Sequence, residues 1–403
     1  MKRDDFPIFS KPVNGQDLVY LDSAATTQKP RVVIDAVRQI YEQSYANANR
    51  GAHTLAGNAS RIVEQARAKV LRFLGAPRDF EVVFTRSTTE ALNLVAHGIA
   101  DEVDPGDEIL LTIAEHHANL LPWQRLARTR GCTLGYLGID DQGFFDPDEL
   151  KRRIKPSTKA LVMTHVSNVL GAIEPIEEMS RVAHAHGLMV VIDAAQSVPH
   201  LPIDLSTLNV DLLAFSAHKV YGPSGVGVLC GRKERLARLT PPLLGGGCVD
   251  DVTLEGMTLA PIPRRLEAGT LNLEGIAGLS AALDYVSGIG HEALRQHETE
   301  LLRRLLDGLE GLGGIQVFGP RRVEQRSGLV SFLVDGVDPH DAAAVLDARG
   351  VALRAGQHCA QPLVERLSPQ GATLRASVGV YNDVSDIDAL IAGLRTVRQV
   401  FGA

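Results

Sequence analysis

The sequence predicts an α/β protein with a large domain on a mainly parallel sheet and a smaller α+β domain at the C-terminal end. Between residues 80 and 230, short apolar runs alternate with helix-like stretches, which is typical of a parallel sheet covered by helices on both faces. After about residue 290 this alternation stops, and strands and helices follow in mixed order. The length of 403 residues also favours two domains. We place residues 20–288 in the large domain, and residues 1–19 and 289–403 in the small one.

Each expected element has a local signal in the sequence. The helix expected over 175–186 begins with a proline and precedes Gly187, and both residue types are common at helix ends. The run LMVVID at 188–193 is apolar until its last residue, as a strand buried on both faces requires. In the large domain we expect strands at 80–85, 108–112, 133–137, 160–164, 188–193, 212–215 and 226–229. In the small domain we expect helices over 291–312, 340–349 and 384–401 and strands at 328–334, 351–353 and 373–378.

Composition and charge exclude several classes of protein. The chain has 41 Lys and Arg against 48 Asp and Glu, a net charge of −7, and no basic block, so we expect neither nucleic acid nor an anionic membrane as a partner. No apolar run approaches the roughly 18 residues that a membrane helix requires. Residues 1–16 are charged, contain two prolines and lack the apolar stretch of a secretory signal. We therefore expect a cytoplasmic protein.

The four cysteines are widely spaced and form no Cys-x-x-Cys pair, so we expect neither a disulfide framework nor a structural metal site. Cys132 and Cys230 lie in apolar, strand-like runs and are expected to be structural. Cys248 follows three glycines and is expected in an exposed loop without a catalytic role. Cys359 lies in a polar loop with Arg354 and His358, which indicates a reactive thiol rather than a buried, inert one. We expect both neighbours to favour its thiolate.

Asp193 ends one predicted strand of the large domain, and Lys219 follows another. Ligand sites of α/β sheets lie at the carboxyl ends of the strands, so both side chains can reach one crevice. Alone, such a lysine is more often a solvated loop residue and such an aspartate a helix cap. Together they are the pair that pyridoxal phosphate requires, an amine that holds the cofactor and an acid that keeps its ring nitrogen protonated. The glycines after Lys219 do not form a dinucleotide fingerprint, because a strand follows them instead of a helix.

A candidate anion site lies where the strand at 80–85 runs into RSTTE at 86–90. Ser87 and Glu90 have the spacing of a capping box. Free amides and the helix dipole favour a phosphate there, and the threonine hydroxyls are further donors. A plain helix cap is the commoner use of this pattern, so only the nearby lysine and aspartate favour the phosphate interpretation.

Two adjacent histidines, His116 and His117, follow the strand at 108–112. Neighbouring side chains point in different directions on a regular backbone, so the pair is poorly suited to bind one metal ion. A lone histidine here is more often structural. An aromatic ring at a strand end can also stack on a flat cofactor.

Ten segments, in order along the chain, closely resemble those of the Suf-type, or group II, cysteine desulfurases, which are fold-type I pyridoxal-phosphate enzymes of the class V aminotransferase type. The resemblance covers nearly the whole chain and implies a seven-stranded sheet in the large domain. Any single motif is weakly to moderately specific, whereas ten in the correct order are very specific. The segments are LDSAATTQKP (21–30), NRGAHTLA (49–56), TRSTTEALNLVA (85–96), EHHANLLPW (115–123), THVSNVLG (164–171), DAAQSVPH (193–200), FSAHKVYGPSGVG (215–227), EAGTLN (267–272), RAGQHCAQPL (354–363) and LRASVGVYN (374–382).

The resemblance implies a role for each matching residue. Lys219 would hold pyridoxal 5'-phosphate covalently and move the Cα proton of L-cysteine. Cys359 would take the sulfur as a persulfide and so release L-alanine. His116 would stack on the ring and transfer protons. The resemblance also implies cofactor contacts for Asp193 at the ring nitrogen and for Gln196 at the ring oxygen. At the phosphate it implies Thr88, Thr89, Ser216, His218 and, from the neighbouring subunit, Thr270. Asn168 would contact the cofactor and, together with Arg375 and Arg354, would bind the substrate carboxylate.

The resemblance also implies a homodimer that hands its persulfide sulfur to a small acceptor protein of the SufE or SufU type for iron–sulfur cluster assembly. The chain departs from the family at Ser87, Gln357 and Asn49, where glycine, histidine and histidine are common, but no departure removes a reactive group. Two alternatives stay open, a selenocysteine lyase or another lyase or hydrolase of this fold, and a non-catalytic sulfur-carrier scaffold. Lys219 and Cys359 favour the desulfurase over both.

Overall fold

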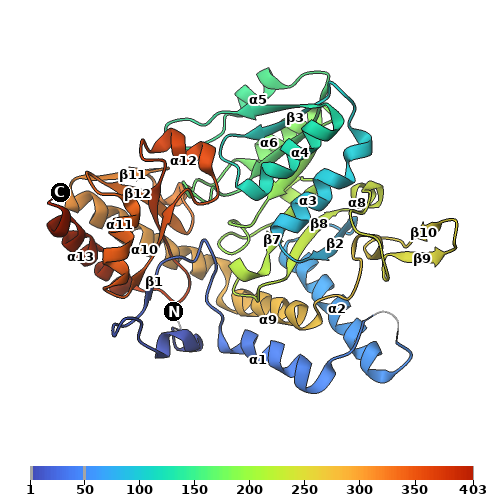
Figure 1. The fold of residues 1–403 in the computed structure, drawn as a ribbon, viewed down its shortest axis with the longest axis horizontal. Helices are drawn as coiled ribbons and strands as arrows, with labels where there is room; N and C mark the ends of the chain where they lie inside the picture. Colours follow the sequence, from blue (N-terminus) through green and yellow to red (C-terminus); the bar gives the residue numbers. More distant parts are fainter. Residues whose placement is uncertain (1–2, 49–50, 403) are drawn as a thin grey trace.

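A seven-stranded sheet between two layers of helices dominates the computed structural model, which describes residues 3–48 and 51–402 (Figure 1). Four neighbouring strand pairs are parallel, and only the two pairs that involve β8 are antiparallel, so the predicted mainly parallel sheet is confirmed. The departure at Asn49 lies outside the described residues. In spatial order the strands are β2 (Phe80–Thr85), β8 (Gly227–Arg232), β7 (Leu212–Ser216), β6 (Met189–Asp193), β5 (Thr158–Thr164), β3 (Glu108–Thr112) and β4 (Thr133–Leu137).

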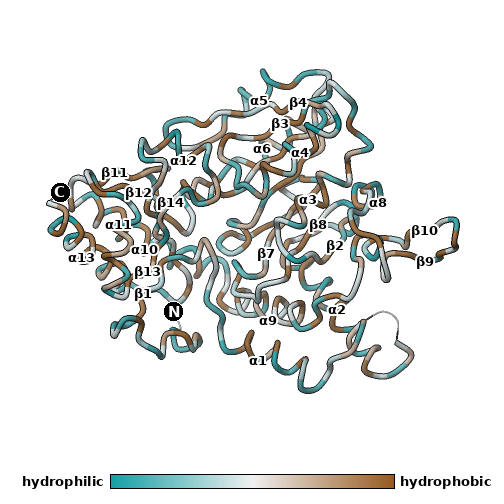
Figure 2. The backbone as a smooth tube through the Cα atoms, in the orientation of Figure 1, coloured by the Kyte–Doolittle hydropathy of each residue, from teal (hydrophilic) through white to brown (hydrophobic). Residues whose placement is uncertain are grey.

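Both faces of this sheet are buried, which explains why its central strands are apolar throughout. In β6, Val190 and Ile192 belong to the core on one face, and Val191 belongs to the core on the other. Figure 2 shows polar residues concentrated at outer segments such as the loops around α5. One face is covered by α1 (Arg31–Gln39), α2 (Thr54–Phe73), α5 (Pro147–Arg153), α6 (Ile176–Ala185) and α9 (Leu273–Ile289), and the other by α3 (Thr88–Gly98), α4 (Leu121–Arg130) and α8 (Lys233–Arg238).

The C-terminal part forms a four-stranded antiparallel sheet packed against three helices around a separate core. The predicted helices over 291–312 and 384–401 form with those bounds. The predicted strand at 351–353 is β13, but it pairs with β1 near the N-terminus instead of joining this sheet. The fourth strand of the sheet is β14, which was not predicted and which leads into the Cys359 loop. The elements are β1 (Val19–Tyr20), β11 (Ile315–Phe318), β12 (Leu329–Val334), β13 (Val351–Ala352), β14 (Arg354–Gly356), β15 (Thr373–Ser377), α10 (His291–Leu312), α11 (Pro339–Asp347), α12 (Gln361–Leu367) and α13 (Val384–Phe401).

The N-terminal segment contacts both parts of the chain. The Phe6 ring is buried against Tyr221 and Tyr285 of the large part and Tyr381 of the C-terminal part, with ring centroids 4.9–6.1 Å apart. Aromatic pairs at such distances stabilise a fold beyond the area that they bury. The division into 20–288 and 1–19 with 289–403 stays a prediction.

The cysteines outside the Cys359 loop are buried. Cys132 and Cys230 are buried as expected, whereas the prediction of an exposed Cys248 is wrong. The Cys248 thiol is fully enclosed and donates a hydrogen bond to the Gly245 carbonyl at 3.1 Å. It lies at the base of an exposed hairpin that projects from the body, formed by β9 (Val249–Val252) and β10 (Met257–Leu259) (Figure 1). Across residues 3–48 and 51–402, no helix combines the length and the apolar character needed to cross a membrane.

Candidate functional site

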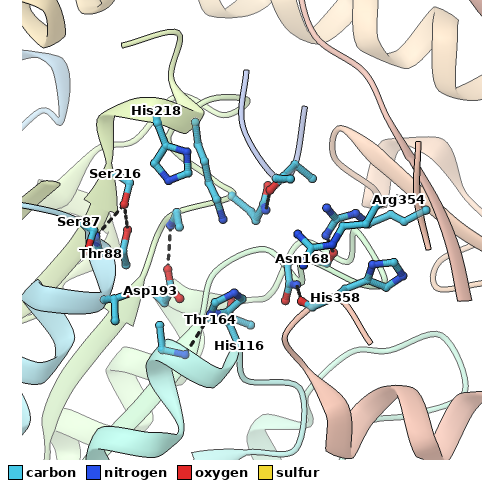
Figure 3. A pocket seen from close by; sticks show the side chains of 18 residues that line it. Ser87, Thr88, His116, Thr164, Asn168, Asp193, Ser216, His218, Arg354 and His358 are labelled. Carbon is cyan, nitrogen blue, oxygen red and sulfur yellow. Dashed lines mark hydrogen bonds between the residues drawn. The ribbon is translucent and has the colours of Figure 1, made fainter. Parts of the chain in front are cut away.

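One pocket lies at the carboxyl ends of the central strands and is closed on one side by the C-terminal part of the chain (Figure 3). Most predicted site residues line it, although they come from segments far apart in the sequence. Thr270 and Cys359 are the exceptions. The predicted residues in the lining are Thr88, Thr89, His116, Asn168, Asp193, Gln196, Ser216, His218, Lys219, Arg354 and Arg375.

Lys219 and Asp193 occupy the ends of two adjacent parallel strands. Asp193 is the last residue of β6, and Lys219 ends the short turn that follows β7. Burial raises the pKa of Asp193, against the opposing effects of the Ala195 N–H, which donates to its Oδ1 at 2.9 Å, and of Lys219. Burial also lowers the pKa of Lys219 to about 8, although Asp193 opposes this shift. A lysine with this pKa is in part an unprotonated, nucleophilic amine at neutral pH.

His116 enters the pocket from the loop after β3. Burial and the charge of Lys219 lower its pKa to about 3, so the ring is neutral. Its Nδ1 accepts a hydrogen bond from the Ala118 N–H at 3.0 Å. In a neutral imidazole the other nitrogen then carries the proton, so His116 presents an Nε2–H donor.

The N-terminus of α3 forms one end of the pocket, where the sequence predicts an anion site. The Ser216 hydroxyl accepts from the Thr88 N–H at 2.7 Å and lies 2.7 Å from the Thr88 hydroxyl. Ser87 caps the helix by accepting from the Glu90 N–H at 3.3 Å. The Glu90 carboxylate accepts from the Arg86 N–H instead of that of Ser87, so only half of the predicted capping box forms.

Two neighbours shape this end of the pocket. A Cβ at Gly227 of β8 would lie 2.4 Å from the Ser87 carbonyl carbon, so only glycine allows this strand to approach the turn. Burial lowers the pKa of His218 to about 4, so its ring is neutral and offers a bound anion a hydrogen bond instead of a full charge. The His218 Nδ1 lies 3.2 Å from the Thr26 hydroxyl.

Arg375 of β15 lines the pocket from the C-terminal part of the chain and is 1% exposed. Its Nη1 donates to the Asn168 carbonyl at 2.8 Å, and its Nη2 donates to Asp22 Oδ1 at 3.3 Å. Its Nε is buried without a partner. A buried guanidinium with an unused N–H suits a carboxylate ligand. Asp22 is not among the residues predicted from the sequence, because nothing in the motif that contains it separates this acid from an ordinary loop aspartate.

Gln196 and Glu115 are two further buried polar side chains that form hydrogen bonds in this region. The Gln196 amide donates to the Ala24 carbonyl at 2.7 Å. Glu115, one residue before His116, is likewise absent from the predicted site. Its carboxyl accepts from the Thr112 hydroxyl at 2.5 Å and from the Asn119 amide at 2.6 Å. Burial raises the pKa of Glu115 to about 8, so it is protonated at neutral pH.

Cys359 lies beside the pocket in a strained loop. His358 and Cys359 have φ angles of 51° and 56°, a left-handed conformation that costs a non-glycine residue about 1–2 kcal/mol. The Cys359 Sγ is half-buried and lies 3.6 Å from the Arg354 Nη2. Burial, together with Arg375 and Arg354, lowers the pKa of His358 to about 2. The prediction that His358 adds positive charge beside the thiol is therefore wrong. Arg354 lies beside the thiol, and Lys219 and Arg375 are close enough to interact with Cys359 electrostatically.

Thr270 lies outside this pocket. It is exposed and lines a separate hollow with Gly246, Gly247 and Gly269. Its predicted contact with the cofactor of a neighbouring subunit stays a prediction.

A buried lysine and aspartate at adjacent strand ends, facing a helix N-terminus in a three-layer α/β structure, define the class of fold-type I pyridoxal-phosphate-dependent enzymes. Residues 19–390 match the aminotransferase class-V family, and the chain belongs to that family. Its relatives within the family carry a narrower name. The chain is 45% identical to a "Probable cysteine desulfurase" of Halalkalibacterium halodurans, a match over 98% of this chain and 97% of that one. It is 43% identical to a "Cysteine desulfurase" of Dickeya dadantii, over 99% and 97% of the two chains.

Solved structures give the same result. An apo structure of a cysteine desulfurase from Thermococcus onnurineus superposes with a TM-score of 0.93 at 38% identity, over 99% of this chain and 97% of that one. The cysteine desulfurase CsdA of Escherichia coli gives a TM-score of 0.91 at 38% identity, over 99% and 98% of the two chains. The predicted fold type and the predicted cysteine desulfurase family are confirmed, whereas the Suf-type subgroup stays a prediction.

Proposed function

We propose that the protein is a pyridoxal-phosphate-dependent cysteine desulfurase that converts L-cysteine to L-alanine and takes the sulfur as a persulfide on Cys359. One observation carries the proposal. A buried Lys219–Asp193 pair and a buried Arg375 with an unused N–H line a single pocket, and a half-buried thiol lies next to it beside Arg354. An amine, a carboxylate-binding group and a sulfur acceptor are what the reaction requires.

The residues of the pocket fit the cofactor. Lys219 would hold it covalently, and Asp193 would contact its ring nitrogen. The Ser216–Thr88 pair at the α3 N-terminus would receive its phosphate. When bound, pyridoxal phosphate withdraws electrons from the substrate carbon atoms. The remaining contacts in this proposal come from Thr89, Gln196, His116, His218 and Asn168.

The protein residues position the substrate and move its protons. Arg375 and Arg354 bind the cysteine carboxylate. Lys219, with its pKa of about 8, accepts the Cα proton in its unprotonated form. The His116 Nε2–H donates a hydrogen bond into the pocket.

The sulfur step balances as a thiol displacement. The Cys359 thiolate attacks the substrate sulfur, so a sulfur–sulfur bond forms and the carbon–sulfur bond breaks. The electron pair of the broken bond remains on the substrate carbon, which takes up a proton and becomes the methyl group of alanine. The strained Cys359 loop keeps the thiol at the pocket rim for this attack.

The finer parts of the proposal come from the ten motifs. The enzyme is of the Suf type, acts as a cytoplasmic homodimer and supplies sulfur for iron–sulfur cluster assembly through a SufE-like or SufU-like acceptor. In this proposal Thr270, exposed and outside its own pocket, reaches the cofactor phosphate of the neighbouring subunit.

The test is turnover of L-cysteine by the purified holoenzyme with a thiol reductant, measured as alanine and sulfide in equal amounts. The assay is repeated with a SufE-like and with a SufU-like acceptor in place of the reductant. We expect alanine formation in every case and a faster rate with the true acceptor. Turnover of selenocysteine without turnover of cysteine would favour the lyase alternative, and a colourless protein without activity would favour the scaffold.

A further inference from the structure

The two adjacent histidines have different surroundings. His116 lines the pocket, whereas His117 is not part of its lining. Their ring centroids lie 6.4 Å apart and their planes meet at 50°. The His117 ring contacts the loop that carries Cys359 instead, so the pair spans the space between the cofactor pocket and the thiol.

Two hydrogen bonds join His117 to that loop. Its backbone N–H donates to the Cys359 carbonyl at 2.6 Å, and its ring Nε2 accepts from the Gln361 N–H at 3.1 Å. Gln361 is the first residue of α12, and Ala360 in the cap position has no side-chain acceptor for the free amides of the first turn. His117 therefore supplies, from the large part of the chain, the cap that α12 lacks. Burial lowers the pKa of His117, which keeps the ring neutral and its Nε2 able to accept.

The Cys359 loop depends on such contacts. Two consecutive non-glycine residues, His358 and Cys359, hold left-handed backbone conformations, which persist only where the surroundings impose them. On one side, the Asn168 side-chain amide donates to the His358 carbonyl at 2.6 Å. On the other side, His117 holds the Cys359 carbonyl and the first amide of α12.

We propose that His117 is a positioning residue that fixes the Cys359 thiol at the rim of the pocket. This inference rests on the proposed function, since it assigns a purpose to the position of the thiol. The peptide group between His116 and His117 then links the ring that faces the cofactor to the loop that receives the sulfur.

The experiment compares three variants of the holoenzyme. H117A removes the ring acceptor, and H117Q replaces it with an amide oxygen of similar reach. H97A changes an exposed histidine on α3 and serves as the control. Hydrogen exchange is measured by mass spectrometry on peptides covering residues 357–364, and the rate of Cys359 alkylation by iodoacetamide is measured without cysteine. The other three cysteines are buried, so the reagent reports mainly on Cys359.

In H117A we expect exchange in this segment to be roughly three- to tenfold faster, the factor that the loss of one ordinary hydrogen bond implies, with faster alkylation of Cys359. H117Q should restore both rates toward those of the wild type, and H97A should change neither. Unchanged exchange in H117A, or a glutamine variant as labile as the alanine variant, overturns the proposal. Because neither readout requires turnover, an enzyme that shows these effects but makes no alanine refutes the proposed function alone.

Discussion

Replacement of Arg326 tests whether buried polar contacts hold the two parts of the chain together. The residue is fully buried, and its guanidinium donates five hydrogen bonds of 2.7–3.3 Å to four backbone carbonyls. One carbonyl belongs to Leu170, in the segment after Asn168, and the other three belong to residues 318–329 of the C-terminal part. All five bonds end on neutral carbonyls, so nothing in them balances the charge.

The magnitude follows from two opposing contributions. Burial lowers the pKa of Arg326 from 12.5 to about 10, which corresponds to about 3 kcal/mol of desolvation. Each hydrogen bond from a charged donor contributes about 1.5–3 kcal/mol, and bonds from one group are not independent. R326L avoids the desolvation cost and loses the hydrogen bonds. Because the bonds are not independent, we take the lower value for each, about 1.5 kcal/mol, and expect a net destabilisation of about 4–5 kcal/mol, a large value for one substitution.

The assay is urea unfolding followed by circular dichroism. Since a chain of this length can unfold in more than one transition, the free energy is taken from the first transition. R326K keeps the charge but has fewer donors, and should fall between R326L and the wild type. R304L is the matched control, because Arg304 pairs with Asp388 on the surface, where an ion pair contributes less than about 1 kcal/mol. If R326L lies within about 1 kcal/mol of the wild type, the reasoning about this contact is wrong.

Three other perturbations test the pocket. K219A should leave a protein that loses its cofactor absorbance on gel filtration and makes no alanine; retention of a stable visible band would contradict the assignment of Lys219. R375K should raise the KM for cysteine at least tenfold, about 1.4 kcal/mol, because lysine cannot reproduce the planar donors, and an unchanged KM would exclude Arg375 from carboxylate binding. The third is E115Q. The folded pKa of Glu115, about 8, lies above its unfolded value of 4.5, so its contribution to stability is present at low pH and is lost as the pH rises through about 8. Glutamine resembles the protonated acid but does not ionise, so E115Q lacks this loss of stability. The melting temperature of E115Q minus that of the wild type should therefore increase between about pH 5 and pH 9. If this difference stays constant over the range, Glu115 is ionised in the folded protein.

The parts of the fold predicted well are those with strong local patterns. The helices α10 and α13 match because their apolar periodicity is long, and β2, β3 and β4 match because short apolar runs between polar turns have few other interpretations. The two-residue pairing of β1 with β13 and the three-residue strand β14 were not predicted. Such short ladders form where packing brings two segments together, so neither segment carries the signal alone.

In the candidate site, too, the residues with a local sequence signal were predicted, and the properties that depend on tertiary surroundings were not. Asp193, Lys219 and His116 were identifiable because the first ends a strand and the other two follow strand ends, which brings all three to one crevice. The enclosure of Cys248 and the neutrality of His358 depend on what surrounds them, which the sequence does not reveal. The same is true of His117, whose partners lie more than 200 positions away along the chain.

The most direct test of the central claim is the location of the sulfur. The holoenzyme is mixed with L-cysteine without reductant, its thiols are blocked, and peptides are analysed by mass spectrometry. We predict the added mass of one sulfur atom on the peptide that contains Cys359, together with one alanine per modified subunit. In C359S both should disappear, while the cofactor spectrum should still change when cysteine binds. Alanine formation by C359S at the wild-type rate would contradict the claim.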